Sequence, residues 1–262
     1  MKRPFKMIRF TIITCTYNAA GVLRRTLESV LCQTWLGVEH LIVDGASADD
    51  TLSVVAAYKN ESDVVGTHSV RVLSEPDKGL YDAMNKGLVH ASGDYVVFLN
   101  AGDFLPAADT LAVIAASAGD GDLPAVMYGD TDIVDYGGRF LRHRRLSPPV
   151  KLTWRSFRYG MLVCHQAFYV RRDIACAESY DLRWRYSADV DWCIRVMKRA
   201  SAERLELRNV GAVVACYLDG GMSVDNHRES LCERFIVMRR HYGVVVTVAM
   251  HFWFVVRAVL HR

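Results

Sequence analysis

Asp103 is the residue whose type and position point most clearly to chemistry. It follows the apolar run 95–99 after a short turn that begins at Asn100. Open α/β sheets bind their ligands beyond the carboxyl ends of strands. Its carboxylate offers the hard oxygen atoms that Mg²⁺ and Mn²⁺ prefer, and phosphates and water can complete the coordination of these ions. We therefore predict that Asp103 is a metal ligand and that the cofactor is Mn²⁺ or Mg²⁺.

Three other polar segments have the residue types that a nucleotide needs. The first, residues 14–18, offers an aromatic face for a planar base. The second places a carboxylate past a strand, where it can accept a hydrogen bond from a base or a ribose, and Gly45 keeps the turn thin. The third places two polar residues on one helix face, near a lysine that could neutralise a phosphate. The predicted nucleotide-binding residues are Thr14, Thr16, Tyr17, Asn18, Asp44, Ser47, Lys78, Asp82 and Asn85.

These segments also have a simpler interpretation as structural loops. Asn18, Asp49 and Asp77 could each do no more than cap a helix. The sequence contains neither a Gly-x-Gly-x-x-Gly motif nor a Walker-type loop. A dinucleotide oxidoreductase and a P-loop enzyme are therefore unsupported, and phosphates would have to be held by a metal and by side chains.

The elements that must position these residues alternate between apolar runs and segments of helical period. Strands are predicted at 10–14, 40–43, 70–74 and 95–99, and helices at 22–34, 50–59, 80–90 and 107–118. This order is typical of a parallel sheet with helices on both faces. The ends of its strands meet at one edge, so residues far apart in sequence converge there.

The pattern changes after Pro124. Short strands are predicted at 126–128, 131–134 and 139–142, and the last two form a hairpin. A strand at 166–170, a helix at 188–198, strand-like residues within 204–215 and a helix at 226–242 follow. We predict an α/β fold with a mostly parallel central sheet, a small antiparallel extension and C-terminal helices. Residues 1–225 would form one domain, followed by a helical tail, 226–262.

Composition excludes several other classes of protein. The net charge of +3 over 262 residues is too small to indicate nucleic-acid binding. The seven cysteines are odd in number and form no Cys-x-x-Cys pair, so reduced thiols in a cytoplasm fit better than disulfides or zinc. The apolar run 10–13 is too short for a signal peptide.

The C-terminal segment 244–260 is apolar but is interrupted by His251 and Arg257. A spanning helix needs about 20 apolar residues. An interfacial helix on an anionic leaflet therefore fits better than a span. Packing on the domain, or on a second copy in a homodimer, is the alternative.

The chain resembles family 2 glycosyltransferases of the GT-A fold, in particular those that build bacterial surface polysaccharides. The likeness covers about residues 8 to 242, and its motifs are specific through their order and spacing. The segments that carry it are 16–18, 44–47, 77–85, 98–103, 165–166, 187–192 and 220–223.

The resemblance implies roles for particular residues. Asp103 corresponds to the last carboxylate of the family's Asp-x-Asp metal motif, but Asn100 and Gly102 replace the usual first and middle residues. Asp189 matches the catalytic base, Ala188 replaces the glutamate before it, and Asp191 competes for the role. His165, Gln166 and Trp184 would line the acceptor pocket, although a lone histidine there could also be a core residue.

The resemblance also implies an activity. We expect an inverting, metal-dependent transfer of a sugar from a nucleotide-diphosphate donor, commonly a UDP-sugar, to a hydroxyl of a saccharide or lipid-linked acceptor. The product would be a capsule or O-antigen type of polysaccharide, made in the cytoplasm at the inner face of the membrane. The basic run 142–145 is either a solvated loop or a contact for a lipid headgroup or phosphate.

Two other functions are compatible with a sheet of this kind. A sugar-phosphate nucleotidyltransferase would need a glycine-rich, arginine-bearing loop after the first strand, and this chain has Thr-Tyr-Asn-Ala-Ala-Gly there. A catalytically inactive sugar-nucleotide-binding or scaffold protein remains an alternative, because acidic residues are missing at positions 100 and 102.

Overall fold

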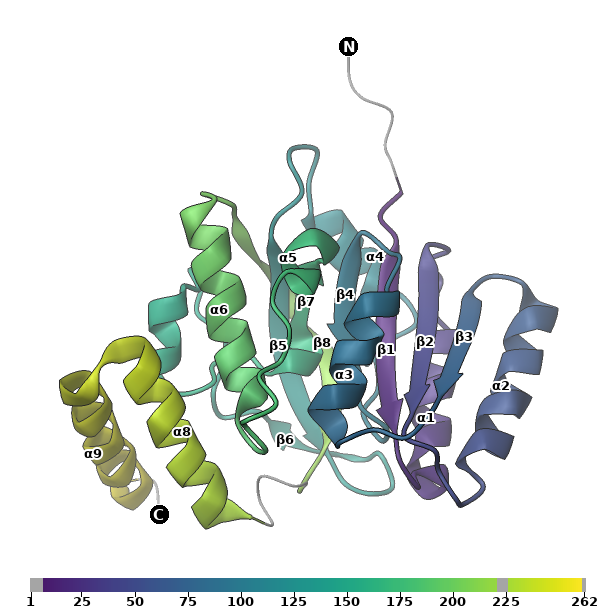
Figure 1. Cartoon of the computed structure of the whole chain (residues 1–262). Coiled ribbons are helices and arrows are strands. Elements are labelled where there is room, and N and C mark those ends of the chain that lie inside the picture. Colours follow the sequence, from purple (N-terminus) through teal and green to yellow (C-terminus); the bar gives the residue numbers. More distant parts are fainter. Residues whose placement is uncertain (1–6, 221–225, 261–262) are drawn as a thin grey trace.

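A computed structural model describes residues 7–220 and 226–260. The resemblance noted for 220–223 therefore falls, after Gly220, outside the described residues. Four parallel strands form the first half of the sheet, in the order β3-β2-β1-β4 (Figure 1). Their bounds are Phe10–Thr16 for β1, Val38–Asp44 for β2, Ser69–Ser74 for β3 and Tyr95–Phe98 for β4.

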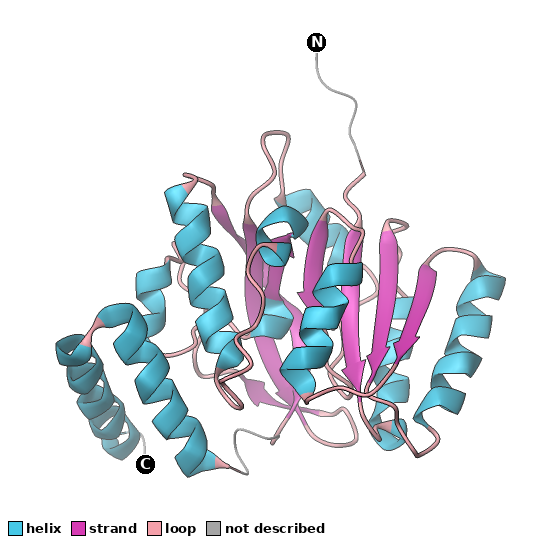
Figure 2. Cartoon of the chain, viewed as in Figure 1, coloured by secondary structure: helices cyan, strands magenta, loops and turns pink. Residues whose placement is uncertain are grey.

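Helices cover both faces of this parallel half, as predicted (Figure 2). β1, β2 and β4 are buried along their whole length, which explains why they are continuous apolar runs rather than alternating ones. The helices that follow the four strands in turn are α1 (Ala20–Leu31), α2 (Thr51–Val65), α3 (Leu80–His90) and α4 (Thr110–Ser117). In α1, Leu23, Leu27 and Val30 recur at helical spacing and are buried.

The second half of the sheet is mostly antiparallel. β7 (Phe168–Arg171) lies between β4 and β5 (Val126–Val134) and runs antiparallel to both. β6 (Phe140–His143) forms the predicted hairpin with the end of β5, and β8 (Leu207–Leu218) pairs in parallel with β5. The α/β class with an antiparallel extension is confirmed.

Two local predictions in this half were wrong, and two short helices were missed. Residues 126–128 and 131–134 belong to one strand, β5, because β8 pairs along its length and bridges the polar residues between them. The predicted strand 166–170 begins later, because a 3₁₀ turn, η2 (His165–Ala167), precedes β7. The 3₁₀ helix η1 (Trp154–Tyr159) and the short helix α5 (Arg172–Cys176) were not predicted.

The C-terminal helices form a layer beside the sheet (Figure 1). α6 (Ala188–Ala202) contacts α8 (His227–Tyr242), which in turn contacts α9 (Val244–Leu260). Gly243 joins α8 to α9 at a φ of 80°, which only glycine adopts without strain. Within the described ranges, no helix is both long and apolar enough to cross a membrane.

Candidate active site

Asp44 organises the loops at the carboxyl end of β1, β2 and β3. Its buried carboxylate accepts hydrogen bonds from the hydroxyls of Thr16 (3.0 Å), Ser47 (2.5 Å) and Ser74 (2.8 Å), and from the backbone N–H of Ser47 (3.0 Å). Burial opposes ionisation, but these hydrogen bonds outweigh it and lower the pKa of Asp44. Asp44 is therefore an anion fixed by four donors. Ser74 was missed by sequence reasoning, although it too is a polar residue at a strand end.

Tyr17 lies exposed beside the loop that follows β2. Its side chain is 67% exposed, which is unusual for a large aromatic residue. Its ring would lie 3.4 Å from a Cβ added to Gly45, and the same Cβ would collide with the carboxylate of Asp77. Three successive strand-end loops therefore meet at Gly45, and a planar group could stack on Tyr17 there.

The other residues of the first loop support the backbone. Asn18 has a φ of 49°, and its N–H donates to Oγ of Ser47 (2.9 Å) while its Oδ1 accepts from the N–H of Ala48 (2.9 Å). Thr14 lies in the interior of the sheet, where its hydroxyl donates to the carbonyl of Leu99 (2.8 Å). The Thr14 hydroxyl is therefore buried, whereas Asn18 is exposed and uses these groups to join two loops.

The predicted residues in and just before α3 have two different environments. Asp82 accepts from the backbone N–H of Lys78 (3.0 Å), and the side chain of Lys78 is exposed. Asn85 instead uses both ends of its amide on the backbone of Tyr180: Nδ2 donates to the carbonyl (3.0 Å) and Oδ1 accepts from the N–H (2.7 Å). Asn85 thereby ties the loop before α6 to α3.

Asp103 is buried and held from two sides. Gln166 Nε2 donates to its Oδ2 (2.8 Å), and the N–H of Leu218 donates to its Oδ1 (3.1 Å). Burial raises the pKa of Asp103 to about 6, against the lowering effects of these hydrogen bonds and of His165. The raised pKa indicates a carboxylate that gains from a positively charged partner.

Asn100 adds a second oxygen to the same loop. Its Oδ1 is buried and has no hydrogen-bond partner in the described structure. An orphaned oxygen beside a buried carboxylate fits a hard cation. No cluster of three or more His, Cys, Asp and Glu side chains suited to a metal occurs in the described part of the chain. A cation there would need phosphate or water oxygens to complete its coordination.

His165 connects this loop to Asp189 at the start of α6. Its Nε2 lies 3.1 Å from Nδ2 of Asn100, and its Nδ1 lies 3.4 Å from Oδ2 of Asp189. Burial raises the pKa of Asp189, but His165, the N–H of Val190 and Arg234 together lower it. Tyr81, which the sequence did not indicate, also interacts with Asp189. Burial of the Tyr81 phenol raises its pKa, and the negative charge of Asp189 raises it further.

Asp191 lies in different surroundings. It is fully buried, with Oδ2 2.7 Å from Nε of Arg195 and Oδ1 2.7 Å from Nε2 of His241. Burial raises the pKa of Asp191, and the hydrogen bonds from His241 and Arg195 more than offset this and lower it. Asp191 thus fastens α8 to α6, and the structure does not bring it to the Asp103 loop.

Glu233 of α8 caps the loop before α6, and sequence reasoning missed it. Its carboxylate accepts from the N–H groups of Arg185 (2.7 Å), Tyr186 (2.7 Å) and Ser187 (3.0 Å). No sequence motif indicates the role of Glu233, because its hydrogen-bond partners lie more than 40 positions earlier in the sequence. Trp184 begins the same loop: it is partly buried, and its indole N–H has no partner among the described residues.

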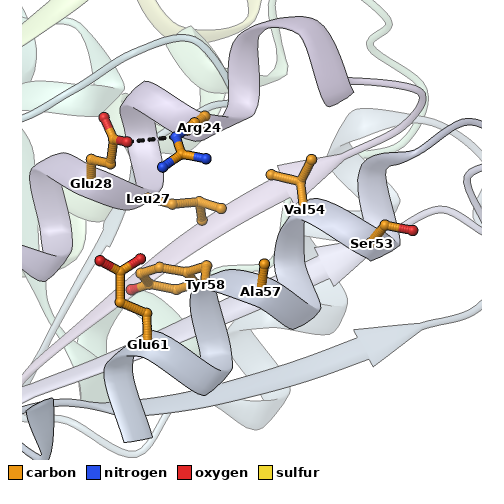
Figure 3. Close-up of a pocket in the computed structure, with 8 residues that line it drawn as sticks. All are labelled: Arg24, Leu27, Glu28, Ser53, Val54, Ala57, Tyr58 and Glu61. Carbon is orange, nitrogen blue, oxygen red and sulfur yellow. Dashed lines mark hydrogen bonds and ion pairs between the residues drawn. The ribbon is translucent and has the colours of Figure 1, made fainter. Parts of the chain in front are cut away.

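A groove between α1 and α2 lies apart from all these residues (Figure 3). An apolar floor is flanked by the ion pair of Arg24 and Glu28. None of the predicted site residues lines it, and it has no cluster of convergent polar groups. The lining residues are Arg24, Leu27, Glu28, Ser53, Val54, Ala57, Tyr58 and Glu61.

Known proteins resemble this chain in both sequence and fold. The family model described as Glycosyl transferase family 2 matches residues 11–178. A PGL/p-HBAD biosynthesis glycosyltransferase of Mycobacterium tuberculosis is 34% identical over 220 residues, 82% of this chain and 78% of that protein.

Solved structures resemble the chain at lower identity. S. aureus TarS 1-349 in complex with UDP-GlcNAc superposes with a TM-score of 0.69 at 17% identity, covering 94% of this chain and 73% of that one. The mannosyltransferase PcManGT from Pyrobaculum calidifontis, in complex with GDP-Man and Mn²⁺, gives 0.60 at 16% identity, covering 95% and 76%. At these identities the likeness shows the fold alone, and it agrees with the expected GT-A architecture.

Proposed function

The chain belongs to glycosyl transferase family 2, and from this premise we propose that it transfers a sugar, with inversion, from a UDP-sugar to an acceptor hydroxyl. The acceptor is a saccharide or a lipid-linked saccharide, and the product is a surface polysaccharide. The observation that carries the proposal is the chain of contacts from Asp103 through Gln166 and His165 to Asp189. These contacts join two parts of the site. One is the Asp103 loop, which is suited to a diphosphate and its cation, and the other is Asp189, which is suited to act as a base.

Asp189 acts as the catalytic base. It lies in the first turn of α6, where the helix dipole stabilises its negative charge. The acceptor hydroxyl attacks the anomeric carbon opposite the diphosphate, and Asp189 takes the hydroxyl proton as the new bond forms, a contribution of about 10²–10⁴-fold. Direct displacement inverts the anomeric centre. Asp191 has both carboxylate oxygens engaged by α6 and α8 side chains, which supports Asp189 over Asp191 for this role.

The donor lies against the first three loops and the Asp103 loop. Tyr17 stacks on the base, and Lys78 and Asp82 bind the ribose and phosphates. Thr14, Thr16, Asn18, Asp44, Ser47 and Asn85 hold the loops in place through the hydrogen bonds described above. Mn²⁺ or Mg²⁺ would be held by Asp103 and by Oδ1 of Asn100, and when bound it would stabilise the charge on the leaving diphosphate. That the PcManGT complex contains Mn²⁺ supports a divalent cation as the cofactor.

The acceptor side is formed by the loop before α6. Trp184 is partly buried and offers its aromatic ring to a sugar. His165 orients Asp189, and Gln166 orients Asp103. We place the reaction in the cytoplasm, at the inner face of the membrane. We assign residues 1–225 to the catalytic domain and 226–262 to a helical tail, whose helix α8 contacts α6.

A nucleotide screen by thermal shift tests the donor half of the proposal. A ligand that binds only the folded state raises apparent stability by mass action. UDP should raise Tm more than GDP, and Mn²⁺ should enlarge the UDP shift. Asp189→Asn should keep this shift and lose transfer. No response to any nucleotide would favour an inactive scaffold, and full transfer by Asp189→Asn would show that another group is the base.

A further inference from the structure

The helix α9 exposes apolar side chains and turns its polar side chains toward the protein, the reverse of an ordinary surface helix. Four of its exposed apolar side chains recur at helical spacing along one face, namely Val245 (84% exposed), Val248 (53%), Phe252 (72%) and Val255 (63%). No charged side chain interrupts this stripe. We call these four residues the α9 stripe.

The polar residues of α9 face the protein instead. Thr247 is buried, and His251 Nδ1 lies 2.9 Å from the Thr247 carbonyl with its ring 5.0 Å from that of Phe235. Arg257 Nη1 donates to the carbonyl of Tyr159 in η1 (3.4 Å). A helix packed on a protein in water places its polar side outward, so the α9 stripe indicates an apolar covering.

A cluster of cations lies at the carboxyl end of α9. Three of the four residues of the basic run 142–145 have partners within the protein. Arg142 pairs with Asp219, His143 pairs with Asp132, and Arg144 donates to backbone carbonyls. The remaining member of the run, Arg145, is exposed. Burial of Arg257 lowers its pKa, and the positive charge of the nearby Arg145 lowers it further.

Arg158 completes this cluster. Its guanidinium lies 4.7 Å from the centre of the Tyr159 ring, whose backbone carbonyl binds Arg257. Arg145, Arg158 and Arg257 form no ion pair with any acid of the described chain. Three neighbouring cations without an acid are suited to bind anions such as phosphates.

We propose that α9 docks the protein on a membrane leaflet that contains anionic phospholipids, with the α9 stripe at the acyl boundary and the exposed Arg145, supported by the neighbouring Arg158, on lipid phosphates. A helix of 17 residues is about 25 Å long and lies in the plane of the leaflet rather than across it. A second copy fits this surface less well, because a symmetric pair would double the unneutralised cations and add no acid.

The place of α9 in the fold suits this orientation. It is the outermost helix on its side of the molecule, with α8 and α6 between it and the sheet (Figure 1). Its carboxyl end points to the same end of the molecule as the arrowheads of the parallel strands (Figure 2). With α9 in the plane of the leaflet, its carboxyl end and the strand-end loops would therefore lie toward the same end of the docked molecule.

Vesicle flotation with the full chain tests the proposal. The protein should float with phosphatidylcholine vesicles that contain 30% phosphatidylglycerol, as a probe composition of roughly bacterial charge, and much less with phosphatidylcholine alone. The double variant Val245→Ser/Phe252→Ser should weaken partitioning about tenfold or more, because it removes the two most exposed members of the α9 stripe. Arg145→Gln should weaken it about fivefold, and only at low salt.

Matched controls separate docking from general surface changes. Val64→Ser/Val89→Ser replaces side chains that are 88% and 80% exposed on α2 and α3, and Arg24→Gln removes an exposed cation of α1. Both should float like the wild type. Equal flotation of the stripe variant and the wild type would overturn the proposal. So would sedimentation showing a dimer that the stripe variant abolishes while neither protein binds vesicles. No sugar nucleotide enters the experiment, so its failure would leave the proposed transfer untouched.

Discussion

Nδ1 of His165 lies 3.4 Å from Oδ2 of Asp189, while Nε2 of the same ring faces the amide nitrogen of Asn100 at 3.1 Å. Because the Asn100 nitrogen is a donor, Nε2 accepts, and the ring proton lies on Nδ1, facing Asp189. The residue that replaces the first acid of the metal motif therefore sets the tautomer of the histidine that orients the proposed base.

The first prediction concerns the two aspartates of α6. Asp189→Asn should lower kcat for transfer by about 10²–10⁴-fold without weakening UDP binding, because the amide cannot accept the proton. Asp191→Asn should instead lower the free energy of unfolding by about 3 kcal/mol, since the neutral amide keeps only one acceptor oxygen for the buried donors of Arg195 and His241. Kinetics and urea unfolding of both variants would measure this. The reverse pattern would make Asp191 the base.

The second prediction concerns His165. His165→Ala should lower kcat about tenfold with little change in the dissociation constant for UDP, because Asp189 loses the donor that orients it. His165→Asn should restore part of the rate, because its amide can also donate a hydrogen bond to the carboxylate. Equal loss in both variants would indicate that the imidazole itself takes part in the chemistry.

The third prediction concerns Glu233, which links the tail to the site. Glu233→Gln should cost about 1–3 kcal/mol of stability and lower kcat, because the amide cannot accept from all three N–H groups of residues 185–187. Glu229→Gln changes an exposed acid on the same helix and should behave as wild type. Unchanged stability and rate in Glu233→Gln would mean that α8 does not hold the loop before Asp189.

Much of the parallel half of the fold could be predicted from the sequence. β1, β2 and β4 are buried apolar runs, and α1 and α3 show the 3.6-residue period, so pattern and structure agree for these elements. The position of β7 between β4 and β5 could not be predicted, because it depends on pairing between residues about 40 to 75 positions apart. Local pattern carries no information about such pairings.

The site could be predicted only in part, for a related reason. Strand-end positions indicated Asp44 and Asp103, because parallel strands bring their carboxyl ends to one edge. What those side chains do depends on partners from distant segments, such as Ser74 for Asp44 and Gln166 for Asp103. Asn85 shows the limit most clearly: its spacing from Asp82 suggested a shared ligand, but its amide binds the backbone of Tyr180.

The fourth prediction concerns the crowded junction at Gly45. Gly45→Ala should weaken UDP binding about tenfold, because the added Cβ collides with the Asp77 carboxylate and lies against the Tyr17 ring. Gly121→Ala adds the same methyl group where nothing lies within 4 Å and should leave binding unchanged. Titration calorimetry with UDP compares them. Wild-type affinity in Gly45→Ala would show that the nucleotide does not use this junction.

The fifth prediction concerns acid stability and rests on the buried His40. The Thr14 hydroxyl donates to the Leu99 carbonyl, so it must accept from Nε2 of His40 (3.0 Å), and Nδ1 then accepts from the Tyr58 hydroxyl (2.7 Å). Burial, with a smaller effect of His68, lowers the pKa of His40 from 6.5 to about 3. The folded state therefore keeps His40 neutral at a pH where the unfolded chain binds a proton.

The sign of the effect follows from linkage. The contribution of His40 is intact above pH 6.5 and is lost progressively as the pH falls from 6.5 toward about 3. Between pH 7 and pH 5 the wild type should lose about 2 kcal/mol of unfolding free energy through this group. His40→Gln, which does not titrate, should lack that part of the slope even if it is less stable at pH 7. Urea unfolding at both pH values would measure the difference, and identical slopes would mean that His40 binds its proton as readily in the folded protein as in the unfolded chain.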